Sequence, residues 1–424
     1  MACGVALWLC TFSIYYATEA KFDSLGVFQQ HNVLFDADPM FRIRSFASGT
    51  GWGDHSLIHP NLGTYFSLPN RVVARVATGT GLYDGPEEDL RRAIALLVGP
   101  AFAASTMTLV FALFLATGFS LPEAGLVSML GAFSFSHLIF GSMPDHFVIG
   151  GFCVAASFCL ASDLIRRGGN IRWVFWTGLG MLTLGITVSN IAWVGVVLLL
   201  ALLASGRPAT NVFRQMGIWL LVVLTLTGVT ADIGRRVYQA DTDQTSLEWN
   251  AEFIEEYWTG DALGRLRKAP AAVANAFAPA GISTRDNRLA RQYGYGRTYM
   301  FTLEQPRSAL VSLVVLVLLT VGTVGCLGAG TTLRVLALGS WLILAGNLTL
   351  HAFFGSEYFL YSQHLLVPAL ILLAGNLRVL GQHRKVAIGA LAAVTALILL
   401  NNVTVLRELL TILATGPSAV SAGM

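Results

Sequence analysis

The chain has 424 residues, of which 54% are hydrophobic and 12% are charged, with a formal net charge of +3. Soluble domains usually carry about 25% charged residues, so the composition excludes an ordinary soluble enzyme. The small net charge and the lack of a basic stripe exclude a nucleic-acid-binding protein. Apolar runs of about 18 residues or more recur along the whole length, which is the pattern of membrane-spanning helices. The sequence therefore predicts an all-α, polytopic membrane protein embedded in a lipid bilayer.

The apolar runs predict about eleven transmembrane helices. The first run has no basic residues ahead of it and no small-residue cleavage site after it, so we expect a retained span rather than a cleaved signal. The expected spans cover residues 3–19, 93–117, 124–142, 146–164, 173–189, 191–205, 214–231, 308–328, 335–353, 359–377 and 386–403. They divide the chain into a first helix (1–19), a long loop (20–92), helices two to seven (93–231), a second long segment (232–307), helices eight to eleven (308–403) and a tail (404–424).

The short connections between spans indicate the orientation in the membrane. Lys and Arg concentrate in connections that face the cytoplasm. Here they occupy alternate connections, which lie on one side of the membrane: Arg166, Arg167, Arg172, Arg207, Arg214, Arg334, Arg378, Arg384 and Lys385. Both long segments are then extracytoplasmic, with the N-terminus inside and the C-terminus outside.

Two acids follow the first expected span. Asp36 and Asp38 stand one residue apart before Pro39, in an otherwise apolar neighbourhood. Two carboxylates at this spacing can share a divalent cation (Mg²⁺, Mn²⁺ or Ca²⁺) or divide the roles of general base and positioning group. The alternative is a solvated turn at the membrane interface. The position beside a span favours a catalytic pair that handles a polar substrate, and a metal, if one is bound, is expected on these two acids.

Cationic side chains and an amphipathic stretch follow in the same loop. Arg42, Arg44 and His59 are candidate partners for a substrate phosphate, because arginine and histidine donate hydrogen bonds to anions. The stretch that begins at Leu68-Pro69-Asn70 places valines on one face and arginines on another. This pattern predicts a helix that lies on the membrane surface.

Three further candidates lie beyond the first loop. Asp145 stands in a short turn on the outer side, where it can either meet the first loop or cap the next helix. Arg285 and Arg288 belong to the most basic part of the second long segment, which holds ten acidic and ten basic residues. That segment shows no clear strand alternation, so we expect a small helical lobe.

The tenth expected span begins with ionisable and polar residues. Glu357, Tyr361 and His364 have the i, i+4, i+7 spacing of one helix face. Ionisable groups within a span usually face a cavity or a site, and an anionic lipid headgroup would need such hydrogen-bond donors. The alternative is a polar contact between helices. We interpret the three residues as part of a substrate site at the outer end of this helix.

Together these features resemble the GT-C superfamily of membrane glycosyltransferases. The resemblance rests on the acidic motif Phe35-Asp36-Ala37-Asp38-Pro39 after the first span, the interfacial helix, the later His59-Pro60 and the second outer segment. The stretch from Glu357 to His364 also resembles late-span motifs of bacterial members. Two features depart from the family pattern. No large soluble domain follows the last span, and the second acidic pair of some members is reduced to Asp145.

The resemblance implies a GT-C-like fold and inverting transfer of a hexose or pentose from a polyprenyl-phosphate donor. The acceptor would be a glycan, lipid or protein at the outer face of a bacterial inner membrane. In the family the acid after the first span acts as base or binds a metal, which here falls on Asp38 or Asp36. A transporter or flippase of lipid-linked saccharides is the alternative, although the ionisable residues cluster at the outer interface rather than in mid-membrane. A membrane acyltransferase that uses His59 or His364 has no supporting second motif.

Overall fold

The structure, a computed structural model, describes residues 2–30, 33–51, 54–239, 246–258, 260–286, 299–303, 309–354 and 358–415. In the first half of the chain the helices are α1 (Ala2–Ser24), η1 (Val27–Gln29), α2 (Pro39–Ser48), α3 (Leu62–Gly79), α4 (Glu87–Leu96), α5 (Val98–Ala116), α6 (Leu121–Ala132), α7 (Phe135–Phe140), α8 (Phe147–Arg166), α9 (Trp173–Ile186), η2 (Val188–Asn190), α10 (Ile191–Ala204) and α11 (Ala209–Tyr238). The second half contains α12 (Leu247–Tyr257), α13 (Ala262–Leu266), α14 (Ala269–Phe277), β1 (Ile282–Asp286), β2 (Tyr299–Leu303), α16 (Ala309–Gly328), α17 (Thr331–Phe353), η4 (Tyr358–Tyr361), α18 (Ser362–Val379), η5 (Gly381–His383) and α19 (Arg384–Thr415).

Long apolar helices account for most of the described chain. Within the described ranges six are long and apolar enough to cross a membrane: Glu87–Ala116 (α4 and α5), α8, α11, α17, Tyr358–Val379 (η4 and α18) and α19. Shorter apolar helices accompany them: α6, α9, Val188–Ala204 (η2 and α10) and Leu313–Gly328 in α16. The expectation of an all-α, multi-pass membrane protein is confirmed in part: the described chain is nearly all-α, and its long apolar helices fit a multi-pass membrane protein. Eleven crossings stay a prediction, because α1, the expected first span, belongs to neither set.

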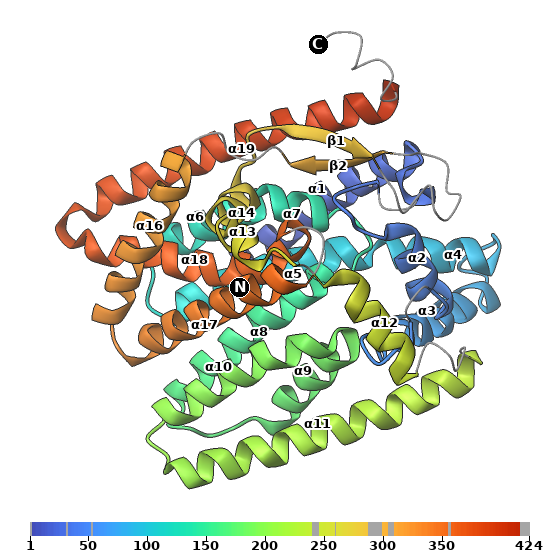
Figure 1. Ribbon diagram of the computed structural model, residues 1–424, viewed down its shortest axis with the longest axis horizontal. Coiled ribbons are helices and arrows are strands. Elements are labelled where there is room, and N and C mark those ends of the chain that lie inside the picture. Colours follow the sequence, from blue (N-terminus) through green and yellow to red (C-terminus); the bar gives the residue numbers. More distant parts are fainter. Residues whose placement is uncertain are drawn as a thin grey trace.

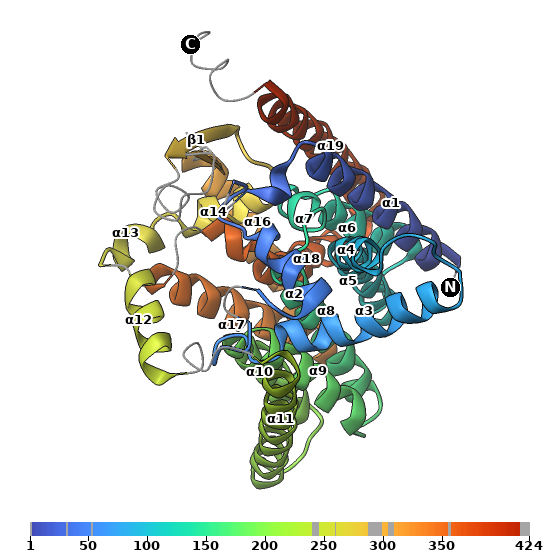
Figure 2. The same ribbon diagram turned by 90° about the vertical axis from the view of Figure 1, so that its right-hand side faces the viewer.

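The helices pack around α18. In its apolar stretch 83% of the residues are buried, whereas the values for α11 and α19 are 22% and 17%. Figures 1 and 2 show α19 and α11 at opposite edges of the molecule, with the other long helices between them. Their outward faces carry exposed leucine, isoleucine and valine, which suits contact with lipid.

Glycines allow α16 and α18 to pack closely. A Cβ atom on Gly375 would overlap the carbonyl oxygen of Gly322, and one on Gly322 would overlap the carbonyl of Leu372. Small residues at such a crossing let two backbones approach, which is how membrane helices gain packing energy without a hydrophobic driving force.

The α16–α18 crossing gives a first prediction. We expect Gly375→Ala to destabilise the protein by about 2 kcal/mol, the usual size of an overpacking effect, because the added methyl group pushes the helices apart. Gly389→Ala in α19 is the matched control, since its Cβ would meet open space. Thermal unfolding in detergent should therefore separate the two variants. Equal melting temperatures would contradict a tight crossing.

The second long segment contains a β-hairpin, so the expectation of a purely helical lobe is wrong. Strands β1 and β2 pair antiparallel from Ile282 with Leu303 to Asp286 with Tyr299. The other edge of β2 contacts the first long loop, where Leu34 forms a parallel bridge with Phe301. The residues of β2 from Met300 to Leu303 are all buried, because β2 lies between β1 and the first loop. Such a strand shows no alternation of apolar and polar residues.

Two helix boundaries also differ from the sequence expectation. Helix α3 begins at Leu62 and includes Pro69, whereas the sequence pattern predicts a start at Leu68-Pro69-Asn70, because proline is commonest in the first turn of a helix. Val72, Val73 and Val76 are exposed on α3, as a helix on the membrane surface requires. Helix α11 continues to Tyr238, so the first residues assigned to the second long segment belong to this helix.

Candidate functional site

One cavity of about 630 Å³ is lined by both long loops and by the ends of several helices. Its walls come from the segments before α2 and α3, the N-terminal ends of α8 and α18, the turn between α9 and α10, α12, and the end of α17. The ionisable or strongly polar residues that line it are Asp36, Asp38, Arg42, His59, Asp145, His146, Asn190, Asn250, His351, Tyr361 and His364. Segments more than 300 residues apart in sequence thus meet at one place.

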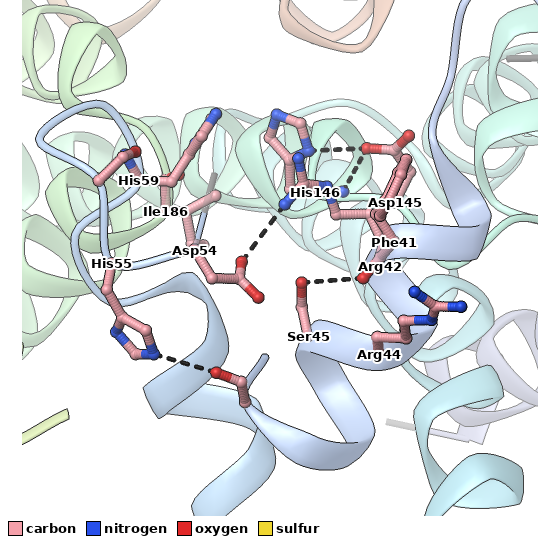
Figure 3. Close-up of polar contacts among 12 residues, drawn as sticks. Phe41, Arg42, Arg44, Ser45, Asp54, His55, His59, Asp145, His146 and Ile186 are labelled. Carbon is pink, nitrogen blue, oxygen red and sulfur yellow. Dashed lines mark hydrogen bonds and ion pairs between the residues drawn. The ribbon is translucent and has the colours of Figure 1, made fainter. Parts of the chain in front are cut away.

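Seven of the sequence candidates line this cavity: Asp36, Asp38, Arg42, His59, Asp145, Tyr361 and His364. Arg44 does not. Its side chain is exposed and points away from the other polar groups, because it lies two residues beyond Arg42 on α2 and therefore on another helix face (Figure 3). Arg285 belongs to β1, but its side chain lies outside the described part of the structure, as do Arg288 and Glu357.

The backbone that carries the acidic pair is strained. Phe35 and Asp36 have positive φ values of 53° and 65°, a conformation that few residues other than glycine adopt. The conformation is held in place because the N–H of Phe35 donates to the carbonyl of Phe301 in β2 at 3.0 Å. The Phe35 ring is fixed against Phe359, with the ring centroids 4.9 Å apart. Residues in such conformations often cluster at functional sites, and here the result is an Asp36 that lines the cavity.

Helix α2 brings Asp38 and Arg42 together. Asp38 is the N-cap of α2 and Pro39 its first residue, so Arg42 follows one helical turn later. The Arg42 side chain is only 2% exposed, and its Nη1 donates to Oδ1 of the equally buried Asp54 at 3.4 Å (Figure 3). This ion pair joins α2 to the loop that carries His59.

Asp145 stands one residue before His146, the N-cap of α8, and lines the cavity. Its Oδ1 accepts hydrogen bonds from the N–H groups of His146 at 2.5 Å and Phe147 at 3.4 Å. The same oxygen lies 2.8 Å from Nδ1 of His146 (Figure 3). Asp145 therefore lines the cavity together with the first loop, and it accepts from the first N–H groups of α8 although the N-cap itself is His146. His146 was missed as a site residue, although its place next to Asp145 in an outer turn was a usable signal.

His59 lies beside His146, with the two ring centroids 4.9 Å apart. Its Nδ1 donates to the carbonyl of Ile186 at 2.6 Å. The Nδ1 atom therefore carries the proton, and the neutral ring keeps its lone pair on Nε2. His55, the other histidine of this loop, instead binds the carbonyl of Gly49 at 3.0 Å and stacks on Tyr238, so its contacts are structural.

Tyr361 and His364 do not share one α-helical face, contrary to the spacing argument. Tyr361 ends the 3₁₀ turn η4, and His364 is the third residue of α18. The tighter winding of the 3₁₀ turn changes the angular offset between them, but both still line the cavity. Tyr361 stacks on His351, which lies at the end of α17 and which the sequence argument missed.

His364 offers a hydrogen-bond donor to the cavity. Nδ2 of Asn190 lies 3.3 Å from Nε2 of His364. An amide nitrogen can only donate, so His364 carries its proton on Nδ1. That Nδ1 is buried and has no hydrogen-bond partner among the residues that the structure describes. Gly150 of α8 makes room for this ring, because a Cβ there would overlap the imidazole.

The charges at this end of the cavity interact. Burial raises the pKa of Asp38 to about 8; Arg42 opposes this rise, and the charges of Asp36 and Asp145 add to it. Burial also tends to raise the pKa of Asp145, but His146 and Arg42 bring that pKa below its ordinary value. Burial, His146 and Arg42 hold the pKa of His59 well below its ordinary value. At neutral pH Asp145 is therefore ionised and His59 neutral, while Asp38 is mostly protonated and loses its proton as the pH rises through about 8.

No group of three His, Cys, Asp or Glu side chains in the described ranges is arranged to hold a metal ion. Asp36 and Asp38 could bind a divalent cation only together with water or substrate oxygens, which is a common arrangement for Mg²⁺. We derive no chemical step through a cation.

No family model matches the chain, and no curated protein matches it.

The raised pKa of Asp38 gives a prediction for stability. In the unfolded chain this carboxyl titrates near 3.8, and in the folded protein near 8. Its contribution to stability is therefore complete below pH 3.8 and is lost as the pH rises through about 8. Asp38→Asn removes this dependence, so its melting temperature should rise by several degrees relative to the parent between about pH 5 and about pH 8. A constant difference across that range would show that Asp38 titrates normally.

Proposed function

We propose that the protein is a membrane glycosyltransferase that transfers a sugar from a polyprenyl-phosphate donor. The observation that carries this proposal is the half-buried Asp38, whose Oδ1 is buried, in a cavity lined by both long loops and by the start of α18. The acceptor is a glycan, lipid or protein at the extracytoplasmic face of a bacterial inner membrane. The GT-C-like order of segments supports the same function.

The polar end of the cavity suits the chemistry of glycosyl transfer. Asp38 takes the proton of the acceptor hydroxyl as its oxygen attacks the anomeric carbon. The bond from that carbon to the phosphate oxygen breaks, and the lipid phosphate leaves with the electron pair. A base works best when its pKa lies near the operating pH, as a value of about 8 for Asp38 does. Arg42 and the Nδ1–H of His364 are placed to stabilise the developing phosphate charge.

The opening of the cavity suits a lipid-linked substrate. Leu57, Val188, Leu247 and Trp258 line the cavity and are also exposed, between 39% and 78%. Exposed apolar side chains beside a polar pocket can hold an isoprenoid chain while the headgroup reaches the acids. The polar groups belong to loops and helix ends, which supports a transferase at the membrane surface over a flippase.

The acidic pair gives a catalytic prediction. We expect Asp38→Asn to lower the transfer rate at least about a hundredfold, the low end for loss of a general base, and Asp36→Asn to have a smaller effect. The parent rate should rise with pH through about 8 as Asp38 loses its proton. Release of polyprenyl phosphate from a panel of lipid-phosphate sugars, with membrane extract as acceptor source, measures both effects.

Asp84→Asn is the control for this experiment, because Asp84 is an exposed acid between α3 and α4. Near-normal turnover in the double variant of Asp36 and Asp38 would remove the acidic pair as the catalytic centre. Donor movement across the bilayer without product formation would favour the flippase instead.

The donor site gives a further prediction. His364→Ala should weaken binding of a polyprenyl-phosphate sugar about tenfold, since a hydrogen bond to a charged group contributes about 1.5 kcal/mol or more. Affinity measured on protein in nanodiscs tests this, with His383→Ala as the control at the far end of α18. If His364→Ala binds the donor as tightly as the parent does, His364 contributes to helix packing and not to donor binding.

A further inference from the structure

The turn between α9 and α10 contacts two histidines of the cavity. This turn, residues 185–190, contains the end of α9 and the 3₁₀ helix η2, and most of it lines the cavity. The carbonyl oxygen of Ile186 accepts from Nδ1 of His59 at 2.6 Å. Four residues later, Nδ2 of Asn190 donates to Nε2 of His364 at 3.3 Å. One short segment therefore contacts two rings that lie more than 300 residues apart in sequence.

These two contacts give the histidines opposite roles toward a ligand. A neutral imidazole has one N–H and one bare nitrogen. The carbonyl of Ile186 can only accept, so His59 directs its N–H to the turn and keeps a bare Nε2. The amide nitrogen of Asn190 can only donate, so His364 directs its bare Nε2 to the turn and keeps the N–H on Nδ1. Within the cavity, His59 can accept a hydrogen bond and His364 can donate one.

The packing around His364 holds this arrangement. The residue is 4% exposed and Asn190 is 5% exposed. A Cβ atom on Gly150 of α8 would lie 2.2 Å from Nε2 of His364 and 3.1 Å from Nδ2 of Asn190, so the glycine admits both side chains at once. The Nδ1 of His364 has no hydrogen-bond partner among the described residues. A buried N–H without a partner costs free energy, and a ligand oxygen that accepts from it would remove this cost.

We propose that Asn190 is a positioning residue, which fixes His364 with its Nδ1–H free to donate to a phosphate oxygen of the substrate, while the same turn fixes His59 to accept from a substrate hydroxyl. This inference rests on the proposed function, in which the lipid-linked donor carries a phosphate and its sugar carries hydroxyls. An ionised phosphate oxygen accepts hydrogen bonds and a hydroxyl can donate one. With its proton on Nε2, His364 would instead present a lone pair to the phosphate.

Nitrogen-15 NMR of the histidines tests the tautomers without substrate, because the ring nitrogens with and without a proton differ in chemical shift. The signals are assigned in nanodiscs by their loss in His59→Ala and His364→Ala. In the parent, both rings should carry the proton on Nδ1. In Asn190→Ala, His364 should move to the Nε2–H form, which predominates in water, whereas His59 should not change because a backbone carbonyl holds it. Asn347→Ala is the matched control, since Asn347 is buried on α17 and donates within its own helix at 3.0 Å.

Affinity for a polyprenyl phosphate in nanodiscs tests the role of this tautomer in binding. We expect Asn190→Ala to weaken binding about tenfold, the effect of losing a hydrogen bond to a charged group, and Asn347→Ala to have no effect. His364→Asn should restore most of the affinity lost in His364→Ala, because the asparagine amide nitrogen can occupy the place of Nδ1. The longer His364→Gln places its amide nitrogen near Nε2 and should bind as weakly as His364→Ala.

Inorganic phosphate is the second probe, because the same N–H could bind a lipid headgroup or a free phosphate. It should bind more weakly than the lipid, since it has no apolar chain to bury. Equal affinities would show a site for free phosphate and would contradict a lipid headgroup.

An unchanged His364 tautomer in folded Asn190→Ala would overturn the proposal, and so would a moved tautomer with unchanged affinity. If Asn190→Ala does not fold, the comparison of His364→Asn with His364→Gln decides, because equal affinities would contradict a donor at Nδ1.

The transfer assay separates this inference from the proposed function. Tautomers and affinities as expected, in a parent that transfers no sugar from any lipid-phosphate donor, would contradict the glycosyltransferase and leave the role of Asn190 intact. Normal transfer with no effect of Asn190→Ala on the tautomer would contradict the inference alone.

Discussion

The buried guanidinium of Arg42 is the interaction on which the rest of the site depends. It is the one lysine or arginine that lines the described part of the cavity, and its charge acts on Asp38, Asp54, Asp145, His59 and His146. Three aspartates in a low-dielectric interior would not ionise without a cation nearby. Helix α2 supplies that cation, which pairs with Asp54 and lies one turn after Asp38.

The apolar helices act on the ionisable groups of the cavity by excluding water. Burial is the largest influence on the pKa of both Asp38 and His59, and it moves the acid up and the histidine down. A low dielectric disfavours the charged form of both groups, so it raises the pKa of a carboxyl and lowers the pKa of a histidine. The packing around α18 therefore both anchors the protein in the membrane and brings the titration of a carboxyl into the neutral range.

Contacts between the two long loops hold the acidic motif in place. The bridge from Leu34 to Phe301 and the hydrogen bond from Phe35 to the same strand fix a backbone that would otherwise relax. Strain of this kind persists only where the surroundings determine it. A change in the hairpin is thus coupled to the position of Asp36, although no described side chain of β1 or β2 lines the cavity.

The sequence by itself determined the class of protein and most of the candidate residues. Hydrophobic run length gives the membrane helices, because a span has to bury its whole backbone in hydrocarbon. Polar residues at the ends of such runs, among them Asp36, Asp38 and His364, are conspicuous against that background. Only the tertiary structure decided which of them meet. The partnership of Arg42 with Asp54, the place of Asn190 beside His364, and the burial of β2 between two segments all depend on contacts between distant parts of the chain. Periodicity indicates which face of one helix is buried, but it carries no information on what lies opposite that face. For that reason the sequence could not distinguish Arg44 from Arg42 as a cavity residue. It also could not distinguish the 3₁₀ turn at Tyr361 from the helix that follows it.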